Sequence, residues 1–166
     1  DDYKDYANSI KTVRTTTIYD KDFFRRDDTC KNNVIRLLYT GRVEKSKGLF
    51  EIVGALSILI RNGFNVELNI VGWTGENDKI ESEIINYSKS LNIRKKIFFH
   101  GYQPLGESLF SFYKNCDIYI LATIGNEGFP RTIWEAMAHS LPVIATKVGS
   151  ISSFLSHNHA SILINP

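Results

Sequence analysis

Residues 34–72 read VIRLLYTGRVEKSKGLFEIVGALSILIRNGFNVELNIVG, and this stretch decides the fold. The apolar run 35–39, closed by Thr40 and Gly41, is typical of a buried strand. Between positions 47 and 61, apolar residues recur every three or four positions, which predicts an amphipathic helix that ends at Gly63. Residues 66–71 form a second strand pattern that runs into Gly72. The stretch therefore predicts a strand–helix–strand unit.

The same alternation continues to the end of the chain. Further helices are predicted over residues 78–91, 106–114 and 131–138, and further strands over residues 97–99, 118–122, 142–145 and, at an edge, 161–164; residues 151–155 fit one helical turn. Strands and helices that alternate with short connections form a parallel sheet covered on both faces. The predicted fold class is α/β, a Rossmann-like doubly wound parallel sheet. Ligands of such sheets bind in the loops that follow the strands, here after Tyr39, Val71, Phe99 and Ala122.

The two ends of the chain differ from this regular part. Residues 1–33 are polar and weakly patterned, and 20–33 are strongly charged, so we interpret 1–33 as an interdomain linker left from an N-terminal half. Residues 34–166 are predicted to form one domain that lacks a closing helix after Asn165 and Pro166. We expect the chain to be part of a two-domain protein.

The composition excludes several classes of protein and partner. Hydrophobic residues make up 43% of the 166 residues and charged residues 23%, as in an average globular protein. With 20 basic and 18 acidic side chains the net charge is +2, which gives no reason to expect a nucleic-acid partner. The basic pairs and runs, Arg25-Arg26 and 94–96, are interpreted as solvated surface. No apolar run reaches membrane-spanning length and the start is not a signal peptide, so a cytoplasmic location is expected, with any membrane contact made peripherally by the other half.

Cysteine and histidine give no sign of a metal site. Cys30 and Cys116 are far apart and belong to no Cys/His cluster, so two free thiols are the simpler interpretation, with Cys116 in the core. His157 and His159 form the one close histidine pair, and a surface loop explains them. These residues therefore predict no metal site, and no cofactor is expected.

The first candidate site is the segment 41–48, GRVEKSKG, between a strand and a helix. Arg42 and Lys47 lie there at the ligand edge of the sheet, beside a helix N-terminus whose N–H groups favour an anion. A planar guanidinium and a compact ammonium together suit a diphosphate. The alternative is a solvated loop with three ordinary positive charges. Gly41 and Gly48 do not make the dinucleotide-binding fingerprint.

The second candidate is the segment 127–135, EGFPRTIWE, which has two carboxylates eight positions apart around a helix start. Pro130 fits the first position of that helix, which places Glu127 in the loop and Glu135 about one turn into the helix. The two carboxylates would then be roughly 8–12 Å apart, which suits the two ends of one elongated ligand. The alternative is an exposed turn with a surface glutamate, but the apolar neighbours of Glu135 favour its burial.

Together these segments resemble the C-terminal domain of the large GT-B class of retaining glycosyltransferases, the group 1 family that includes sucrose synthases and many bacterial polysaccharide enzymes. The family's Gly-Arg…Lys-Gly loop matches Gly41-Arg42 and Lys47-Gly48, and its Glu-x7-Glu motif matches Glu127 and Glu135 within EGF…EAMA. The segments 98–102, 113–119 and 141–145 also resemble family motifs in the expected order. The resemblance runs from about residue 34 to residue 166.

The resemblance implies a role for each matching residue. Arg42 and Lys47 would neutralise the diphosphate, Glu127 would hold hydroxyls of the transferred sugar, and Glu135 would hold the ribose. The base would meet backbone near Tyr102 and Gln103, and the loop from Gly41 would complete the nucleotide site. Backbone of the helix start would hold the distal phosphate, through Gly128, Phe129, Pro130, Arg131 and Thr132. The donor would be a UDP-, GDP- or ADP-linked sugar used without a metal, and the glycan or lipid-linked acceptor would bind the missing N-terminal domain.

This sequence departs from the family's pattern in three places, and two other functions are alternatives to glycosyl transfer. Pro130 replaces a common glycine and offers no N–H; Ser140 occupies a position where a left-handed residue is expected; Ser150, Ser152 and Ser153 replace a Gly-x-Pro-Glu pattern. A nucleotide-sugar epimerase of related fold would use the same carboxylates and diphosphate site. A non-catalytic scaffold would keep the fold alone. We expect the leading function, hexosyl transfer in polysaccharide or glycoconjugate synthesis, to need the full-length enzyme, and the isolated domain to be inactive.

Overall fold

The architecture is a six-stranded sheet in which every neighbouring pair of strands is parallel. The computed structural model describes residues 18–75, 79–125, 127–128, 130–156 and 161–166. The strands lie in the order β3-β2-β1-β4-β5-β6, with β1 (Ile35–Thr40), β2 (Val66–Val71), β3 (Ile97–Phe99), β4 (Ile118–Leu121), β5 (Val143–Thr146) and β6 (Ser161–Ile164). The α/β prediction is confirmed, and β6 is the edge strand that the sequence predicts.

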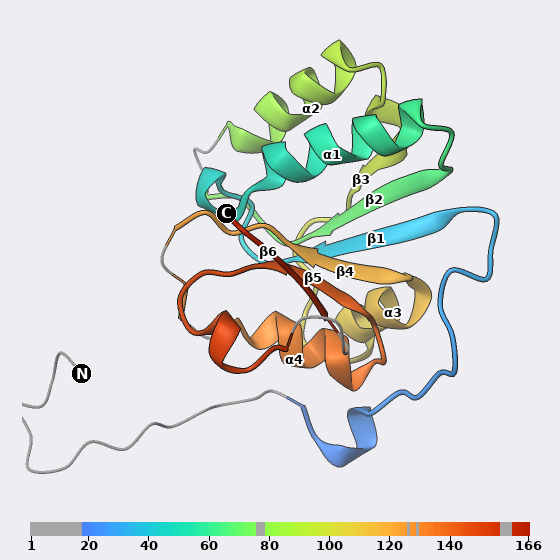
Figure 1. Ribbon diagram of the computed structural model, residues 1–166, viewed down its shortest axis with the longest axis vertical. Helices are drawn as coiled ribbons and strands as arrows, with labels where there is room; N and C mark the ends of the chain where they lie inside the picture. Colours follow the sequence, from blue (N-terminus) through green and yellow to red (C-terminus); the bar gives the residue numbers. More distant parts are fainter. Residues whose placement is uncertain (1–17, 76–78, 126, 129, 157–160) are drawn as a thin grey trace, which may run out of the picture.

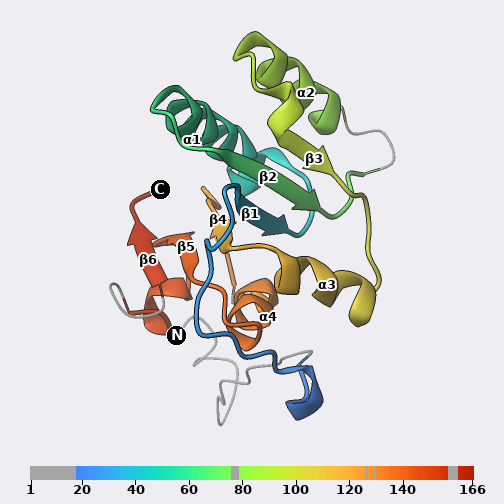
Figure 2. The same cartoon turned by 90° about the vertical axis from the view of Figure 1, so that its right-hand side faces the viewer.

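Helices cover both faces of the sheet. In the described part of the chain, α1 (Leu49–Arg61) and α2 (Ile80–Ser90) lie on one face, and α3 (Glu107–Asn115) and α4 (Arg131–Ala138) lie on the other (Figures 1 and 2). Short 3-10 turns are η2 (Asp20–Asp22), η3 (Lys45–Lys47), η4 (Arg94–Lys96) and η5 (Ile151–Ser153). The boundaries agree with the sequence predictions to within two residues. The apolar spacing of α1 explains its orientation, because Leu49, Ile52, Val53 and Leu56 are all buried.

The chain changes faces between β1 and β4, and this creates the crevice that holds the site. β1 and β2 pair in register from Ile35↔Val66 to Thr40↔Val71, so they end at the same level. On its other side β1 pairs with β4, through Leu37↔Ile118 and Leu38↔Tyr119. The loop after β1 leads to the α1 face and the loop after β4 leads to the α4 face. Ligands of doubly wound sheets bind where two such loops diverge.

The interpretation of Arg26 as solvated surface is wrong. Its guanidinium donates three hydrogen bonds to main-chain oxygens, from Nη2 to Tyr113 at 2.5 Å, from Nη1 to Cys116 at 2.9 Å and from Nε to His139 at 3.2 Å. Tyr113 lies in the last turn of α3, and Cys116 and His139 are the C-cap residues of α3 and α4, so their carbonyls are at helix ends that lack helical partners. Figure 1 shows this segment passing the ends of both helices before it enters β1. Sequence reasoning missed this contact because Arg26 is 87 residues or more from its partners.

The structure also bears on the expectations for the cysteines, Ser140, the histidine pair and membrane-spanning helices. Cys116 is buried and burial raises the pKa of its thiol to about 12, whereas Cys30 is exposed, and both are free. Ser140 adopts a left-handed φ of 56°, as the position requires. His157 and His159 lie outside the described residues. Within those residues, none of the helices combines the length and apolar content needed to cross a bilayer.

Candidate functional site

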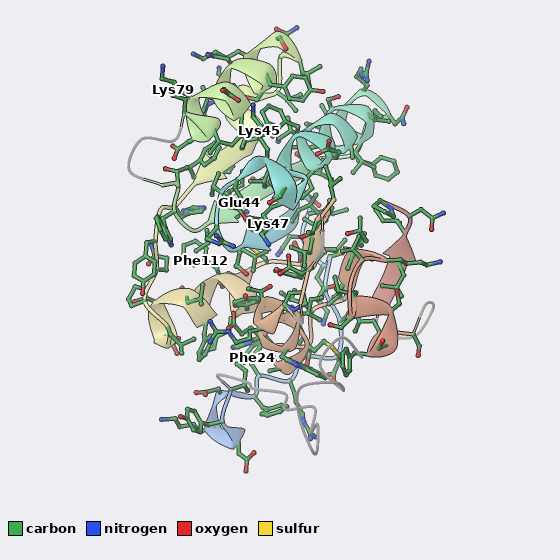
Figure 3. All side chains as sticks on the ribbon, turned by 90° about the vertical axis from the view of Figure 1, so that its left-hand side faces the viewer. Phe24, Glu44, Lys45, Lys47, Lys79 and Phe112 are labelled. Carbon is green, nitrogen blue, oxygen red and sulfur yellow. The ribbon has the colours of Figure 1, made fainter. Side chains whose placement is uncertain are left out.

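Two adjoining cavities lie at the carboxyl edge of the sheet, where β1 parts from β4. One, of about 300 Å³, lies between the loops after β1, β2 and β3, and the other, of about 290 Å³, lies between the loop after β1 and the start of α4. Figure 3 looks onto this edge, with Glu44, Lys45 and Lys47 on the turn that leads into α1. The residues common to both cavities are Thr40, Gly41, Arg42, Arg131, Thr132 and Glu135. They therefore form one continuous crevice.

The crevice brings together most of the residues that the sequence singled out. Those that line it are Gly41, Arg42, Lys47, Tyr102, Gln103, Glu127, Pro130, Arg131, Thr132 and Glu135. Gly128 is not among the lining residues, although it follows Glu127 directly. Phe129 lies outside the described residues.

The loop after β1 is held on two sides. The Gly41 and Val43 amides donate to the main-chain oxygens of Val71 and Trp73 in and after β2, at 3.0 Å each. On the other side the Ile124 amide donates to the Ser46 oxygen at 2.9 Å. The Tyr39 hydroxyl donates to the Arg42 oxygen at 2.6 Å from below. The backbone that carries Arg42 and Lys47 is therefore fixed, and the alternative of a loosely solvated loop does not describe it.

The two cations of this loop differ in their environment. The ammonium of Lys47 donates to Oε2 of Glu127 at 2.5 Å, and the two side chains are only 14% and 18% exposed. Arg42 lies 3.5 Å from Glu44 and is 64% exposed. A pair shielded from water interacts more strongly than an exposed one, because the effective dielectric is lower. Lys47 is therefore already ion-paired with Glu127 without a ligand, whereas the guanidinium of Arg42 is exposed to solvent.

Glu135 belongs to a buried hydroxyl network. It is 5% exposed, and its Oε2 accepts a hydrogen bond from the Tyr113 hydroxyl at 2.8 Å. Burial raises the pKa of Tyr113 well above its usual range, so the hydroxyl stays protonated and donates. The Thr40 hydroxyl lies 2.6 Å from that of Tyr113, and as a carboxylate only accepts, Thr40 is the donor to Tyr113. This fixes the carboxylate of Glu135 and excludes the alternative of a surface glutamate.

A parallel contact orients Thr132. The Tyr119 hydroxyl donates to Oγ1 of Thr132 at 2.7 Å, and burial raises the pKa of Tyr119 to about 12. Thr132 opens α4, together with Arg131. The expectation that Pro130 is the first helical residue is wrong, because its ψ of 112° is extended and makes it the N-cap. A proline with extended ψ still precedes a helix without cost, since no N–H is needed there.

The first cavity has an apolar wall. Trp73, Tyr102, Leu105 and Leu109 line it, and the first three are more than half exposed. Gln103 is tethered there, because its Nε2 donates to the His100 oxygen at 3.0 Å. Exposed aromatic rings at a cavity mouth offer a flat apolar surface to a planar group.

Sequence reasoning missed several residues of the crevice. Thr40, Tyr113 and Tyr119 read as core positions of strand and helix, and their hydroxyls give no signal until the fold brings them beside Glu135 and Thr132. Trp73 follows Gly72 directly, so its place after a predicted strand is the one signal that could have found it.

Comparisons with known proteins agree with this fold. The family model of glycosyl transferases group 1 matches residues 20–166. The capsular polysaccharide biosynthesis glycosyltransferase CapM of Staphylococcus aureus is 32% identical over 120 residues, which cover 71% of this chain and 30% of CapM. The chain thus spans about a third of the length of the curated relatives it matches.

Solved structures show the same architecture. A glycosyltransferase from Rickettsia africae superimposes with a TM-score of 0.74 at 27% identity, over 81% of this chain and 34% of that one. At 22% identity, where the likeness shows the fold alone, are Anabaena HepE with UDP and glucose (TM-score 0.74, 81% of this chain and 35% of HepE) and the C-terminal domain of LpcC from Francisella tularensis (0.75, 88% and 78%). The sheet and motifs of this chain, together with these matches, show that the chain belongs to the group 1 family of glycosyltransferases, with the GT-B fold and the likeness of a C-terminal domain.

Proposed function

We propose that this chain is the donor-binding half of a retaining glycosyltransferase that uses a nucleoside-diphosphate sugar in polysaccharide or glycoconjugate synthesis. One observation carries the proposal: a single crevice at the switch point of the sheet holds Arg42, Lys47, Glu127 and Glu135 together. The binding of UDP by HepE and the work of CapM on capsular polysaccharide support it. Residues 1–33 would be the link to the acceptor half, and the complete enzyme would transfer a hexose.

The two cavities suit the two ends of such a donor. The base would lie against the apolar wall at Tyr102 and Gln103, and the ribose would meet the fixed carboxylate of Glu135. The diphosphate would lie in the second cavity, near Arg42 and Lys47.

The rest of the site would complete the grip on the donor. The amides at the start of α4 would add a favourable dipole at the distal phosphate. Glu127 would hold the sugar. The cations would stabilise the charge that grows on the leaving diphosphate, so that no metal is needed.

Thermal unfolding with UDP, GDP, ADP and NAD tests the proposal. A ligand at 100 times its dissociation constant stabilises a protein by about 2.7 kcal/mol, a rise of roughly 5–10 °C for this size. We expect one nucleoside diphosphate to produce such a rise, and NAD to produce none. Replacing Glu135 by alanine should weaken that nucleotide by about 1–3 kcal/mol, because the ribose hydrogen bonds are lost.

Two controls separate this role of Glu135 from a general effect. Glu51→Ala removes an exposed carboxylate of α1 and should leave the affinity unchanged. The 2′,3′-dideoxy form of the nucleotide should bind wild type and Glu135→Ala alike, since it lacks the hydroxyls. Equal affinity of the normal nucleotide for both proteins would remove the ribose role, and no response to any nucleotide would favour a non-catalytic scaffold.

Arg42→Ala in the full-length enzyme should lower turnover by at least about tenfold, and more than it lowers donor affinity. The reason is that the charge facing Arg42 develops only as the sugar leaves, so its contribution is greatest in the transition state. Steady-state kinetics with varied donor measure both effects. Lys45→Ala, an exposed cation of the same loop, is the matched control and should change neither. A change confined to the apparent donor affinity contradicts this role.

A further inference from the structure

The ion pair between Lys47 and Glu127 joins two segments 80 residues apart in sequence. Glu127 is held from its own side, because its Oε2 also accepts from the Thr123 hydroxyl at 3.3 Å, and the oxygen of Thr123 accepts from Thr146 at 2.6 Å. The backbone of Glu127 packs closely against Gly149, since a Cβ on Gly149 would lie 1.7 Å from the Glu127 main-chain oxygen. The carboxylate is therefore fixed in the second cavity, and Lys47 reaches across to it.

The other two cations of the crevice are not occupied in this way. Within the described part of the chain, the guanidinium of Arg42 has only the exposed contact with Glu44 at 3.5 Å. Arg131 is exposed, and among the described residues its guanidinium makes no ion pair or hydrogen bond. A diphosphate that enters can use both of these at once, but it must share Lys47 with a carboxylate already in place.

We propose that Glu127 competes with the diphosphate for Lys47 and thereby speeds release of the nucleoside diphosphate product. The inference rests on the proposed function. While the donor is bound, the sugar hydroxyls would occupy the carboxylate of Glu127 and leave Lys47 to the diphosphate. Once the sugar has been transferred, the carboxylate of Glu127 is again available to Lys47 and neutralises part of the positive charge of the ammonium. Glu127 thus weakens the hold on the product more than the hold on the donor.

The test is a set of calorimetric titrations with UDP, uridine and inorganic pyrophosphate in the presence of EDTA. Glu127→Gln keeps the size of the side chain and removes its charge. We expect it to bind UDP and pyrophosphate about tenfold more tightly than wild type, a change of ~1.4 kcal/mol, because Lys47 no longer has a competing anion. Uridine, which carries no phosphate, should bind both proteins equally. An affinity that increases on removal of a site residue is the opposite of what a simple contact predicts.

Three further variants make the outcome specific. Glu44→Gln removes the carboxylate beside Arg42 and should change pyrophosphate affinity less than twofold, because that pair is exposed. In Lys47→Met the Glu127→Gln substitution should give no gain, which shows that the effect passes through Lys47. Glu127→Asp provides a second test should the glutamine variant fold poorly, with an intermediate gain expected from the shorter reach.

The possible results separate this inference from the proposed function. If wild type binds UDP but Glu127→Gln binds UDP and pyrophosphate no more tightly, the competition is disproved and the donor site stands. If the gain appears for uridine as well, the variant has altered the cavity and the inference is also wrong. If neither protein binds UDP, GDP, ADP or pyrophosphate, the proposed function fails together with it.

Discussion

Alanine at position 48 is expected to destabilise the protein by about 4 kcal/mol. Gly48 ends η3 and precedes α1 with φ of 69° and ψ of 26°, a left-handed conformation that costs other residues about 1–2 kcal/mol. A Cβ there would also lie 1.9 Å from the main-chain oxygen of Ala122, just after β4. Backbone cannot rotate away as a side chain can, and forced overpacking costs about 1–3 kcal/mol. Thermal unfolding should show a midpoint roughly 8–16 °C below that of wild type.

Gly63→Ala is the matched control for this strain. Gly63 also has a positive φ, of 87°, but a Cβ there would meet nothing within 4 Å. The control therefore carries the conformational cost alone, about 1–2 kcal/mol. The difference between the two variants measures the clash between the loop of Lys47 and the loop of Glu127. Equal melting points would show that these loops move apart freely, and the fixed site described above would then be wrong.

The fold could be predicted from sequence because each element carries its own local signal. The periodicity between 47 and 61 and the apolar run of 35–39 depend only on neighbouring residues, and the structure confirms a helix and a strand there, at Leu49–Arg61 and Ile35–Thr40. The alternation of strands and helices then leaves a doubly wound parallel sheet as the consistent arrangement. Even the left-handed position of Ser140 follows from its place after a helix.

The interior of the site could not be predicted in the same way. The pairing of Lys47 with Glu127 exists because β1 and β4 are neighbours in the sheet, which no local pattern records. The buried tyrosines of the hydroxyl network look like ordinary core residues until strand order places them beside Glu135. The sequence therefore singled out polar residues that line one crevice, and only the fold identified which of them share a hydrogen bond.

The contacts of Arg26 are the clearest example of what local sequence patterns could not predict. Replacing Arg26 by alanine should have the second largest effect on stability and lower the free energy of unfolding by about 3 kcal/mol. Hydrogen bonds from a charged donor contribute about 1.5–3 kcal/mol each, although water can replace part of them at this half-buried position. The guanidinium also stands at the negative ends of two helices, where a cation is favourable. Both effects are lost together in Arg26→Ala.

Arg25→Ala is the control, because Arg25 carries the same charge one position earlier and is exposed. Thermal unfolding should place Arg26→Ala roughly 6–12 °C below wild type and Arg25→Ala within about 1 °C of it, the usual range for a surface change. Arg26→Lys should fall between them, since an ammonium keeps the charge but cannot span three carbonyls as a planar fork does. If Arg26→Ala and Arg25→Ala have the same unfolding midpoint, the segment before β1 is not anchored to α3 and α4. If the segment is anchored, it fixes the direction in which the chain enters β1. The stability of the ends of α3 and α4 then depends on a residue that precedes the first strand of the sheet.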